Sequence, residues 1–275
     1  MTPSDSHPAL PAVEALRGLG TLRYEQDAAG IGLLVLARPP VNALGRELVT
    51  DLCRAAAVLA EDRSVRALVL AGDGRTFCAG ADLKERQSMT LDDVRGFVHA
   101  VSRTFQAIAE LPMPTVAAVH GTAAGGGCEL ALACDFRVLD TDGRIGLPET
   151  TLGIVPGAGG TQRLPRLVGS ARAKKWIFSG RLFTSAEALA DGVVDAVATT
   201  DRVRAVAFEF VAEMAAAAPL SVRAAKKAVH LALSLSLEAG LAAEWQAYES
   251  ILHTEDRLEA LAAFREKRKP VFRGR

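Results

Sequence analysis

Two glutamates, each beside a glycine-rich segment, are the residues of this chain best suited to chemistry. Glu129 follows Gly125-Gly126-Gly127-Cys128, and Glu149 lies between Gly146-Leu147-Pro148 and the glycine-rich stretch 153–160. Glycine allows a ligand to approach the backbone closely, and the first N–H groups of a helix have no partner within that helix. Two carboxylates beside such donors suit a reaction in which charge grows on a carbonyl oxygen while a proton moves nearby.

The glycine cluster before Glu129 matches neither of the common nucleotide-binding motifs. A dinucleotide fingerprint needs a third glycine where Leu130 stands, and a Walker loop needs lysine where Gly127 stands. We therefore interpret the cluster as the glycine-rich start of a helix, whose positive end would stabilise an oxyanion. Tight packing of this loop against a strand explains the glycines equally well.

Each glutamate also has an ordinary structural explanation. Glu129 could be a first-turn acidic residue that the helix dipole stabilises, but its neighbours Cys128 and 130–133 are apolar and predict a buried side chain. A buried carboxylate without a partner is costly, and function is a common reason to keep one. Glu149, taken alone, is more typical of a turn or capping residue before 150–152.

Three other segments have weaker claims to function. Residues 76–84 follow a strand and could supply a second exposed N–H donor, although an ordinary strand-to-helix loop explains them as well. His120 ends a strand, where a hydrogen-bonded structural role is commoner than catalysis. The basic run 265–269 is typical of a solvated helix end, or it could meet a phosphate. The chain contains no Gly-x-Ser-x-Gly motif of the serine hydrolases.

The elements that must position these residues alternate between strand and helix over the first two thirds of the chain. After about residue 170, apolar residues recur at helical spacing, with one short strand expected at 193–197. This helical part could pack against a neighbouring subunit or cap its own core. The expected strands are 21–25, 31–37, 65–70, 115–119, 136–139 and 145–147, and the expected helices are 42–59, 91–109 and 126–134.

The pattern predicts an α/β protein in three parts. Residues 1–18, with three prolines, are expected to be a disordered tail without a targeting segment. Residues 19–200 would form the core that carries the site, and residues 201–275 a helical C-terminal region. No apolar run approaches the roughly 20 residues of a membrane span, so we expect no membrane partner.

Composition narrows the classes of partner. Lys plus Arg and Asp plus Glu number 32 each in 275 residues, and this zero net charge argues against a nucleic-acid partner. The four cysteines include no Cys-x-x-Cys pair, which favours free thiols in a reducing, cytoplasmic environment. The five scattered histidines form no ligand pattern, so neither a metal nor a separate cofactor is expected.

Taken together, these segments resemble the enoyl-CoA hydratase/isomerase, or crotonase, superfamily over roughly residues 20–275. The similar segments are 77–84, 125–129 with 133–135, 148–164 and 256–268. The resemblance implies a crotonase-like spiral of ββα units followed by a helical trimerisation region. It also implies a homotrimer or a dimer of trimers, and an acyl-CoA thioester as the substrate, so that coenzyme A is part of the substrate.

The same resemblance implies roles for individual residues. The backbone N–H groups of Ala81 and Gly126 would form the oxyanion hole, and Glu129 and Glu149 would be catalytic with them. Phe264 and Lys267 would approach coenzyme A from a helical tail, which could be that of a neighbouring subunit. The full set expected to contact substrate is Ala79, Ala81, Asp82, Leu83, Lys84, Gly126, Phe264 and Lys267, of which Ala79, Asp82 and Leu83 would lie along the adenine and pantetheine.

Because both glutamates are present, the resemblance favours hydration of a trans-2-enoyl-CoA to a 3-hydroxyacyl-CoA. It leaves open which glutamate is the base and which the acid. Lys84-Glu85-Arg86 is similar to a subgroup that includes methylglutaconyl-CoA hydratases, in which Lys84 or Arg86 would pair with a carboxylate on the acyl tail. The resemblance also allows isomerisation of a 3-enoyl-CoA by one glutamate, or a catalytically silent binding protein with the same fold.

Overall fold

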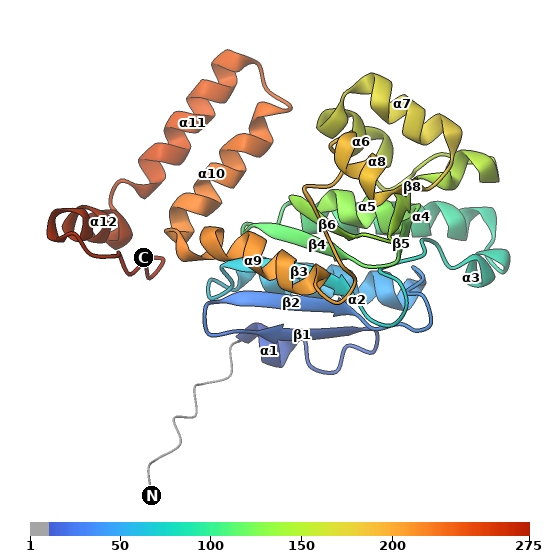
Figure 1. Cartoon of the computed structure of the whole chain (residues 1–275), viewed down its shortest axis with the longest axis horizontal. Coiled ribbons are helices and arrows are strands. Elements are labelled where there is room, and N and C mark those ends of the chain that lie inside the picture. The colour runs from blue at the N-terminus through green and yellow to red at the C-terminus, as the bar shows by residue number, and fades with distance from the viewer. Residues whose placement is uncertain (1–10) are drawn as a thin grey trace, which may run out of the picture.

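A six-stranded sheet in the order β1-β2-β3-β4-β6-β9 forms the centre of the molecule, whose computed structural model describes residues 11–275 (Figure 1). β1 runs antiparallel to β2 as a hairpin, and all the other neighbours are parallel. The strands are β1 (Leu22–Gln26), β2 (Ile31–Leu36), β3 (Ala67–Gly72), β4 (Thr115–Val119), β6 (Phe136–Asp140) and β9 (Ala196–Ala198).

A second, three-stranded sheet lies beside the first and comprises β5 (Thr122–Ala124), β7 (Arg144–Gly146) and β8 (Phe183–Thr184). β5 follows β4 after two residues, and β7 follows β6 after a short turn, so successive strands of the chain step from one sheet to the other. The helix α5 (Gly126–Ala133) then returns the chain from β5 to β6. This repeat is the expected spiral of ββα units.

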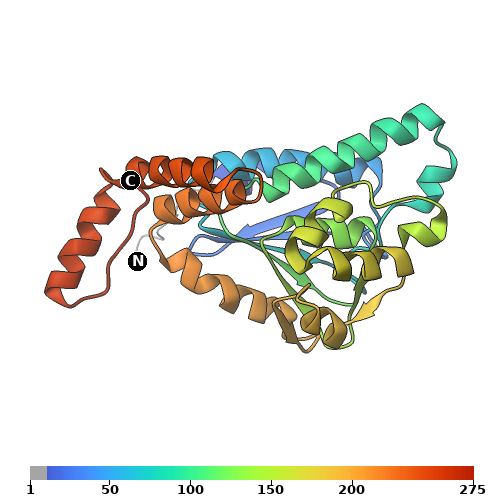
Figure 2. The same cartoon turned by 90° about the horizontal axis from the view of Figure 1, so that it is seen from above.

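Alternate residues of the large sheet face two separate hydrophobic clusters. Leu68 and Leu70 of β3 pack toward the helices α2 (Arg46–Glu61) and α4 (Leu91–Ala109), together with α5. Val69 of the same strand faces the other way, toward the buried stripe of α9 (Val203–Ala216). Figure 2 shows α2 and α4 along one side of the sheet and α9 on the other. Strands buried on both faces explain the continuous apolar runs in the sequence.

The helical C-terminal region projects from this core. The helices α10 and α11 form a hairpin that stands away from the sheets in Figure 1, and neither contains a buried residue. Within residues 11–275 no single helix is long and apolar enough to cross a membrane, and only α9 and α10 together, across a 106° bend, pass that test. The remaining elements are α1 (Pro11–Ala15), α3 (Leu83–Gln87), a 3-10 helix η1 (Pro148–Leu152), α6 (Gly160–Val168), α7 (Ser170–Ser179), α8 (Ser185–Ala190), α10 (Pro219–Ala232), α11 (Leu237–Ile251) and α12 (Glu255–Glu266).

The structure corrects three expectations. The disordered tail over 1–18 is wrong for residues 11–18, because Ala12 of α1 and Leu16 just after it are buried in the core. Residues 1–10 lie outside the described part. The helix expected from residue 42 begins at Arg46, because the Asn42 amide donates instead to the carbonyls of Asp73, Thr76 and Phe77. The three-residue β5 and the two-residue β8 were not expected, because such short strands leave no pattern.

We predict that Gly127→Ala destabilises the fold while the matched helical change Gly96→Ala does not. A Cβ on Gly127 would overlap the carbonyl oxygen of Cys78 and lie 2.9 Å from its carbonyl carbon, whereas a Cβ on Gly96 meets nothing within 4 Å. Overpacking against backbone should lower the free energy of unfolding by about 2 kcal/mol or more. The Gly96 change should be neutral or stabilise by up to about 1 kcal/mol. Urea unfolding measures both, and equal stabilities would contradict the close packing described here.

Candidate functional site

The glycine-rich loop and the start of α5 expose two backbone donors side by side. The loop 78–81 is held against β5 by the bonds Cys78 N–H to Thr122 O and Ala124 N–H to Cys78 O, each 3.1 Å. A Cβ on Gly80 would lie 2.6 Å from the Ala124 carbonyl oxygen and 3.5 Å from the Gly126 nitrogen. Within residues 11–275, neither the Ala81 nor the Gly126 N–H donates to a protein acceptor, and both residues are partly accessible. These donors are therefore available to a ligand oxygen.

Gly125 makes this arrangement sterically feasible. It is the residue before α5, and its φ of 54° and ψ of −120° are conformations that side chains disfavour. A Cβ there would also lie 3.1 Å from Oε1 of Glu149. The loop glycine thus brings the start of α5 and the second carboxylate together, which a larger residue would prevent.

Glu129 lies one turn into α5 with its side chain buried. Its Oε1 accepts two hydrogen bonds, from the backbone N–H of Ala158 at 2.7 Å and of Gly160 at 2.9 Å. Burial raises the pKa of Glu129 above its ordinary value, and the N–H groups of Gly160 and Ala158 offset part of that rise. These two bonds favour the ionised carboxylate.

Glu149 is buried in a different environment. It lies in η1, directly after β7, and within residues 11–275 its Oε2 has no hydrogen-bond partner and no exposure to solvent. Burial raises the pKa of Glu149 to about 7, and the charge of Glu129 acts in the same direction. With a pKa of about 7, Glu149 can give a proton near neutral pH, whereas the two N–H groups on Glu129 favour its ionised form, a difference that suits acid–base catalysis.

Four other residues expected at this site lie next to Ala81 in the chain. Ala79, Leu83 and Lys84 are exposed beside Ala81. The Asp82 carboxylate is occupied by the protein itself, because it caps α3 through the N–H groups of Lys84 and Glu85 and accepts from Arg38 at 2.7 Å.

The single chain does not bring Phe264 and Lys267 to the carboxylates. Both lie at the end of α12, where Phe264 is 87% exposed. α12 and α3 lie at opposite ends of the molecule in Figures 1 and 2. A contribution of either residue to this site would have to come from another copy of the chain.

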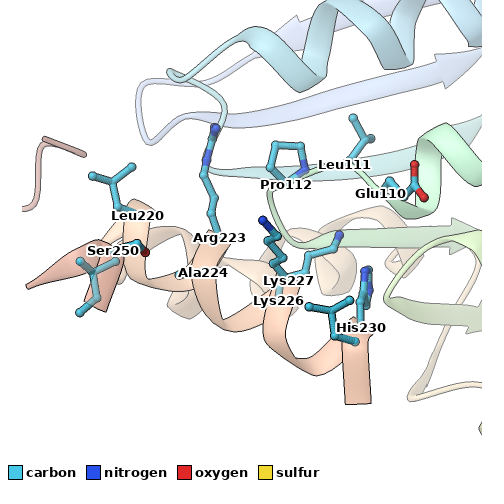
Figure 3. Close-up of a pocket in the computed structure, with 12 residues that line it drawn as sticks. Glu110, Leu111, Pro112, Leu220, Arg223, Ala224, Lys226, Lys227, His230 and Ser250 are labelled. Carbon is cyan, nitrogen blue, oxygen red and sulfur yellow. The ribbon is translucent and has the colours of Figure 1, made fainter. Parts of the chain in front are cut away.

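A separate pocket lies away from the carboxylates, where α10 meets the core. Its volume is about 600 Å³, and Figure 3 shows the basic side chains of Arg223, Lys226, Lys227 and His230 around it. The Lys226 ammonium is already bound to Asp135 at 2.6 Å and to the Met113 carbonyl at 2.8 Å. None of the residues expected to do chemistry lines this pocket, which forms the junction between the core and the helical C-terminal region.

Sequence reasoning missed the residues that hold Glu129. Ala158 and Gly160 donate only through backbone N–H groups, which every residue except proline has. Apart from the glycines nearby, nothing in the sequence therefore marks them as donors. The segment 156–163 could have been recognised as a loop before a helix, but not as the partner of α5. His120 has the structural role expected of it, since its Nε2 lies 3.1 Å from the Gly74 carbonyl oxygen.

Comparisons with known proteins agree with this architecture. The sequence model of the enoyl-CoA hydratase/isomerase family matches residues 26–275. The chain is 42% identical to the enoyl-CoA isomerase/hydratase fer4 of Mycosarcoma maydis, over 90% of this chain and 94% of that protein. It is 41% identical to the mitochondrial methylglutaconyl-CoA hydratase of Mus musculus, over 91% of this chain and 82% of that protein.

A solved structure is similar to this chain in both fold and sequence. The crystal structure of an enoyl-CoA hydratase from Bacillus anthracis superimposes with a TM-score of 0.90 at 41% identity, covering 93% of this chain and all of that one. The likeness extends over the ββα core and the helical C-terminal region. On the strength of the family match, the relatives and this shared fold, the chain belongs to the enoyl-CoA hydratase/isomerase family and has its crotonase fold.

Proposed function

We propose that the protein is an enoyl-CoA hydratase, which adds water across a trans-2-enoyl-CoA to give a 3-hydroxyacyl-CoA. The observation that carries this proposal is the pair of buried carboxylates beside two backbone N–H groups that donate to no acceptor within residues 11–275. In the same part of the chain, Glu129 accepts two backbone hydrogen bonds, whereas Oε2 of Glu149 accepts none and the pKa of Glu149 is raised to about 7. Hydration needs such a pair, because one group must take a proton from water while another gives a proton to carbon.

In this mechanism the thioester carbonyl oxygen accepts hydrogen bonds from the N–H groups of Ala81 and Gly126. Gly126 is the first residue of α5, so the positive end of the helix dipole acts on the same oxygen. As water adds, the double-bond electrons move toward the carbonyl and form an enolate, whose charge these donors stabilise. One such donor is typically worth about 3 kcal/mol in the transition state.

The two carboxylates divide the proton transfers. Oε1 of Glu129 is held by two N–H groups, which leaves Oε2 to take a proton from the attacking water. The hydroxide portion bonds to the β-carbon, and the protonated Glu149 delivers its proton to the α-carbon of the enolate. One proton is taken up and one is given, so a proton exchange restores the starting state. We therefore assign Glu129 as the base and Glu149 as the acid.

A second candidate is hydration of an acyl tail that ends in a carboxylate. Lys84 is exposed and Arg86 is partly exposed, and their acidic neighbours Asp82 and Glu85 pair with arginines outside α3. Within residues 11–275 no carboxylate forms a salt bridge with Arg86, so its charge is available to a distal carboxylate of the substrate. The relative named methylglutaconyl-CoA hydratase favours this substrate class, and the one named isomerase/hydratase favours isomerisation through one glutamate.

We also propose that the chain assembles as a trimer or a dimer of trimers. α10 and α11 bury no residue in the single chain, although Leu237, Trp245 and Tyr248 on α11 expose more than half of their surface. Exposed apolar faces of this extent are typical of subunit interfaces. A neighbouring copy would also bring its own α12 within reach of another chain.

The proposed compartment is the cytoplasm. The four cysteines Cys53, Cys78, Cys128 and Cys134 are free thiols, and all but Cys53 are buried. Free thiols are typical of a reducing compartment. Several relatives are named mitochondrial and others are bacterial, so the family itself occurs in more than one compartment.

Glu129→Gln and Glu149→Gln should each lower the rate of hydration of crotonyl-CoA by about 100-fold or more, because each removes one proton transfer. Loss of the enoyl-thioester absorbance measures the rate, and calorimetry with a non-reacting acyl-CoA should reveal far smaller changes in affinity. Glu213→Gln, an exposed change on α9, is the control and should leave the rate unchanged. Near-normal turnover in either glutamate variant would refute the two-carboxylate mechanism.

The difference in stability between Glu149→Gln and wild type should depend on pH. It should favour the variant more at pH 8 than at pH 4.5. The folded pKa of Glu149 is raised to about 7 from its ordinary 4.5, so this group stabilises the fold fully below pH 4.5 and loses that contribution as the pH rises through 7. Glutamine does not ionise and escapes the loss, which is on the order of 3 kcal/mol. Urea unfolding from pH 4.5 to 8 measures this, and a difference independent of pH would contradict the raised pKa.

Sedimentation equilibrium at micromolar concentration should give three or six times the chain mass of 28.9 kDa. The driving force is burial of the apolar faces of α10 and α11, and Trp245→Lys should shift the distribution toward smaller species because it places a charge in that interface. A wild-type protein that stays monomeric across the micromolar range would refute the proposed assembly.

A further inference from the structure

The loop that holds Glu129 is itself held from behind by Arg163. Nη1 of Arg163 donates to the carbonyl oxygen of Ala158 at 2.9 Å, and the N–H of the same alanine donates to Glu129. Nη2 donates to Oε1 of Gln106 in α4 at 2.8 Å. The Gln106 amide in turn donates to Glu110 at 2.7 Å. One guanidinium therefore connects the Glu129 loop to a long helix of the core.

The guanidinium is packed closely against the loop. Gly159 has a φ of 113°, in a region that favours glycine, and a Cβ on it would overlap Nη1 of Arg163. A Cβ on Gly160 would lie 3.2 Å from Oε1 of Glu129 on the other side. The backbone of 158–160 thus fills the space between the guanidinium and the carboxylate, so a displacement of Arg163 would displace the two N–H donors.

Electrostatics supports the same arrangement. The positive charge of Arg163 lowers the pKa of Glu129 against the larger effect of burial, and so favours the ionised base. Burial lowers the pKa of Arg163 itself, which indicates that the guanidinium is partly desolvated. A cation held in such a place carries a cost that a solvated surface arginine avoids. Arg166, further along α6, is exposed, and among the described residues its side chain bonds only to Gln162 of its own helix.

We propose that Arg163 is a positioning residue for hydration, which fixes the Ala158–Gly160 loop and through it the orientation of the Glu129 carboxylate. This inference rests on the proposed function of Glu129 as the base that takes a proton from water. In this role Arg163 acts through the loop and through its charge, and not by contact with the reacting atoms.

The first experiment compares the pH profiles of Arg163→Met, Arg163→Lys and the control Arg166→Met with crotonyl-CoA as the substrate. Arg163→Met should lower kcat about 10- to 100-fold with KM changed less than about 3-fold, because the base is misplaced while the oxyanion donors remain. Loss of the positive charge raises the pKa of Glu129, so the acid limb of kcat should move up by roughly one pH unit. Arg163→Lys keeps the positive charge, so the acid limb of its pH profile should lie close to that of wild type. Arg166→Met should have the same kcat and the same pH profile as wild type.

The outcomes separate this inference from the proposed function. A wild-type protein that does not hydrate any enoyl-CoA would overturn the function. An active wild type whose Arg163→Met variant keeps its kcat within about 3-fold, or loses kcat without any shift of the acid limb, would overturn the role of Arg163 alone. If Arg163→Met fails to fold, Arg163→Gln is judged by the same criteria, since it keeps an amide donor for the Ala158 carbonyl but no charge.

A second experiment needs no catalysis. Unfolding of Arg163→Met, Glu129→Gln and the double variant at pH 5 and pH 8 forms a double-mutant cycle. The loss of stability from Arg163→Met should be larger with Glu129 present than in the Glu129→Gln background, and the difference should grow from pH 5 to pH 8, because rising pH favours the ionised carboxylate that the guanidinium attracts. Strict additivity at both pH values would overturn the coupling between Arg163 and Glu129.

Discussion

The burial of the Glu129 carboxylate is the constraint on which the rest of the site depends. A charge removed from water is costly unless hydrogen bonds replace its hydration. Here the replacement comes from two backbone N–H groups of a loop 29 and 31 residues further along the chain. That loop must turn tightly enough to aim both donors at one oxygen, which requires glycine at 159 and 160. The Glu129 carboxylate and the backbone of this loop are therefore one structural unit.

Glu149 represents the opposite solution to the same problem. Its carboxyl is buried without a compensating donor to Oε2, so the protein holds it by retaining a proton rather than by supplying partners. Such a group costs stability as the pH rises, and a well-packed apolar residue in its place would be expected to stabilise the fold. The two carboxylates thus differ in their hydrogen bonding, because the loop 158–160 donates to Glu129 and, within the described residues, nothing donates to Oε2 of Glu149.

The core and the helical C-terminal region differ in how far a single chain buries their apolar surfaces. The large sheet is covered on both faces within one chain, by α2 and α4 on one side and α9 on the other. No residue of α10 or α11 is buried within the single chain. At the end of α12, Phe264 is exposed and lies far from the carboxylates. Under the proposed assembly, the residues expected to complete the substrate site from that end would reach it only from a neighbouring chain.

The sequence by itself determined the strands of the large sheet, the longer helices and the two glutamates, because each leaves a local pattern of hydrophobicity, glycine or charge. The helix 91–109 and the strand 115–119 were predicted to the residue, since proline and capping residues mark their ends. Only the tertiary structure decided that Ala158 and Gly160 bind Glu129, that Asp82 caps the N-terminus of α3, and that α1 packs on the core. Backbone donors carry no side-chain signal, and a carboxylate's partner depends on which distant segments the sheets bring together.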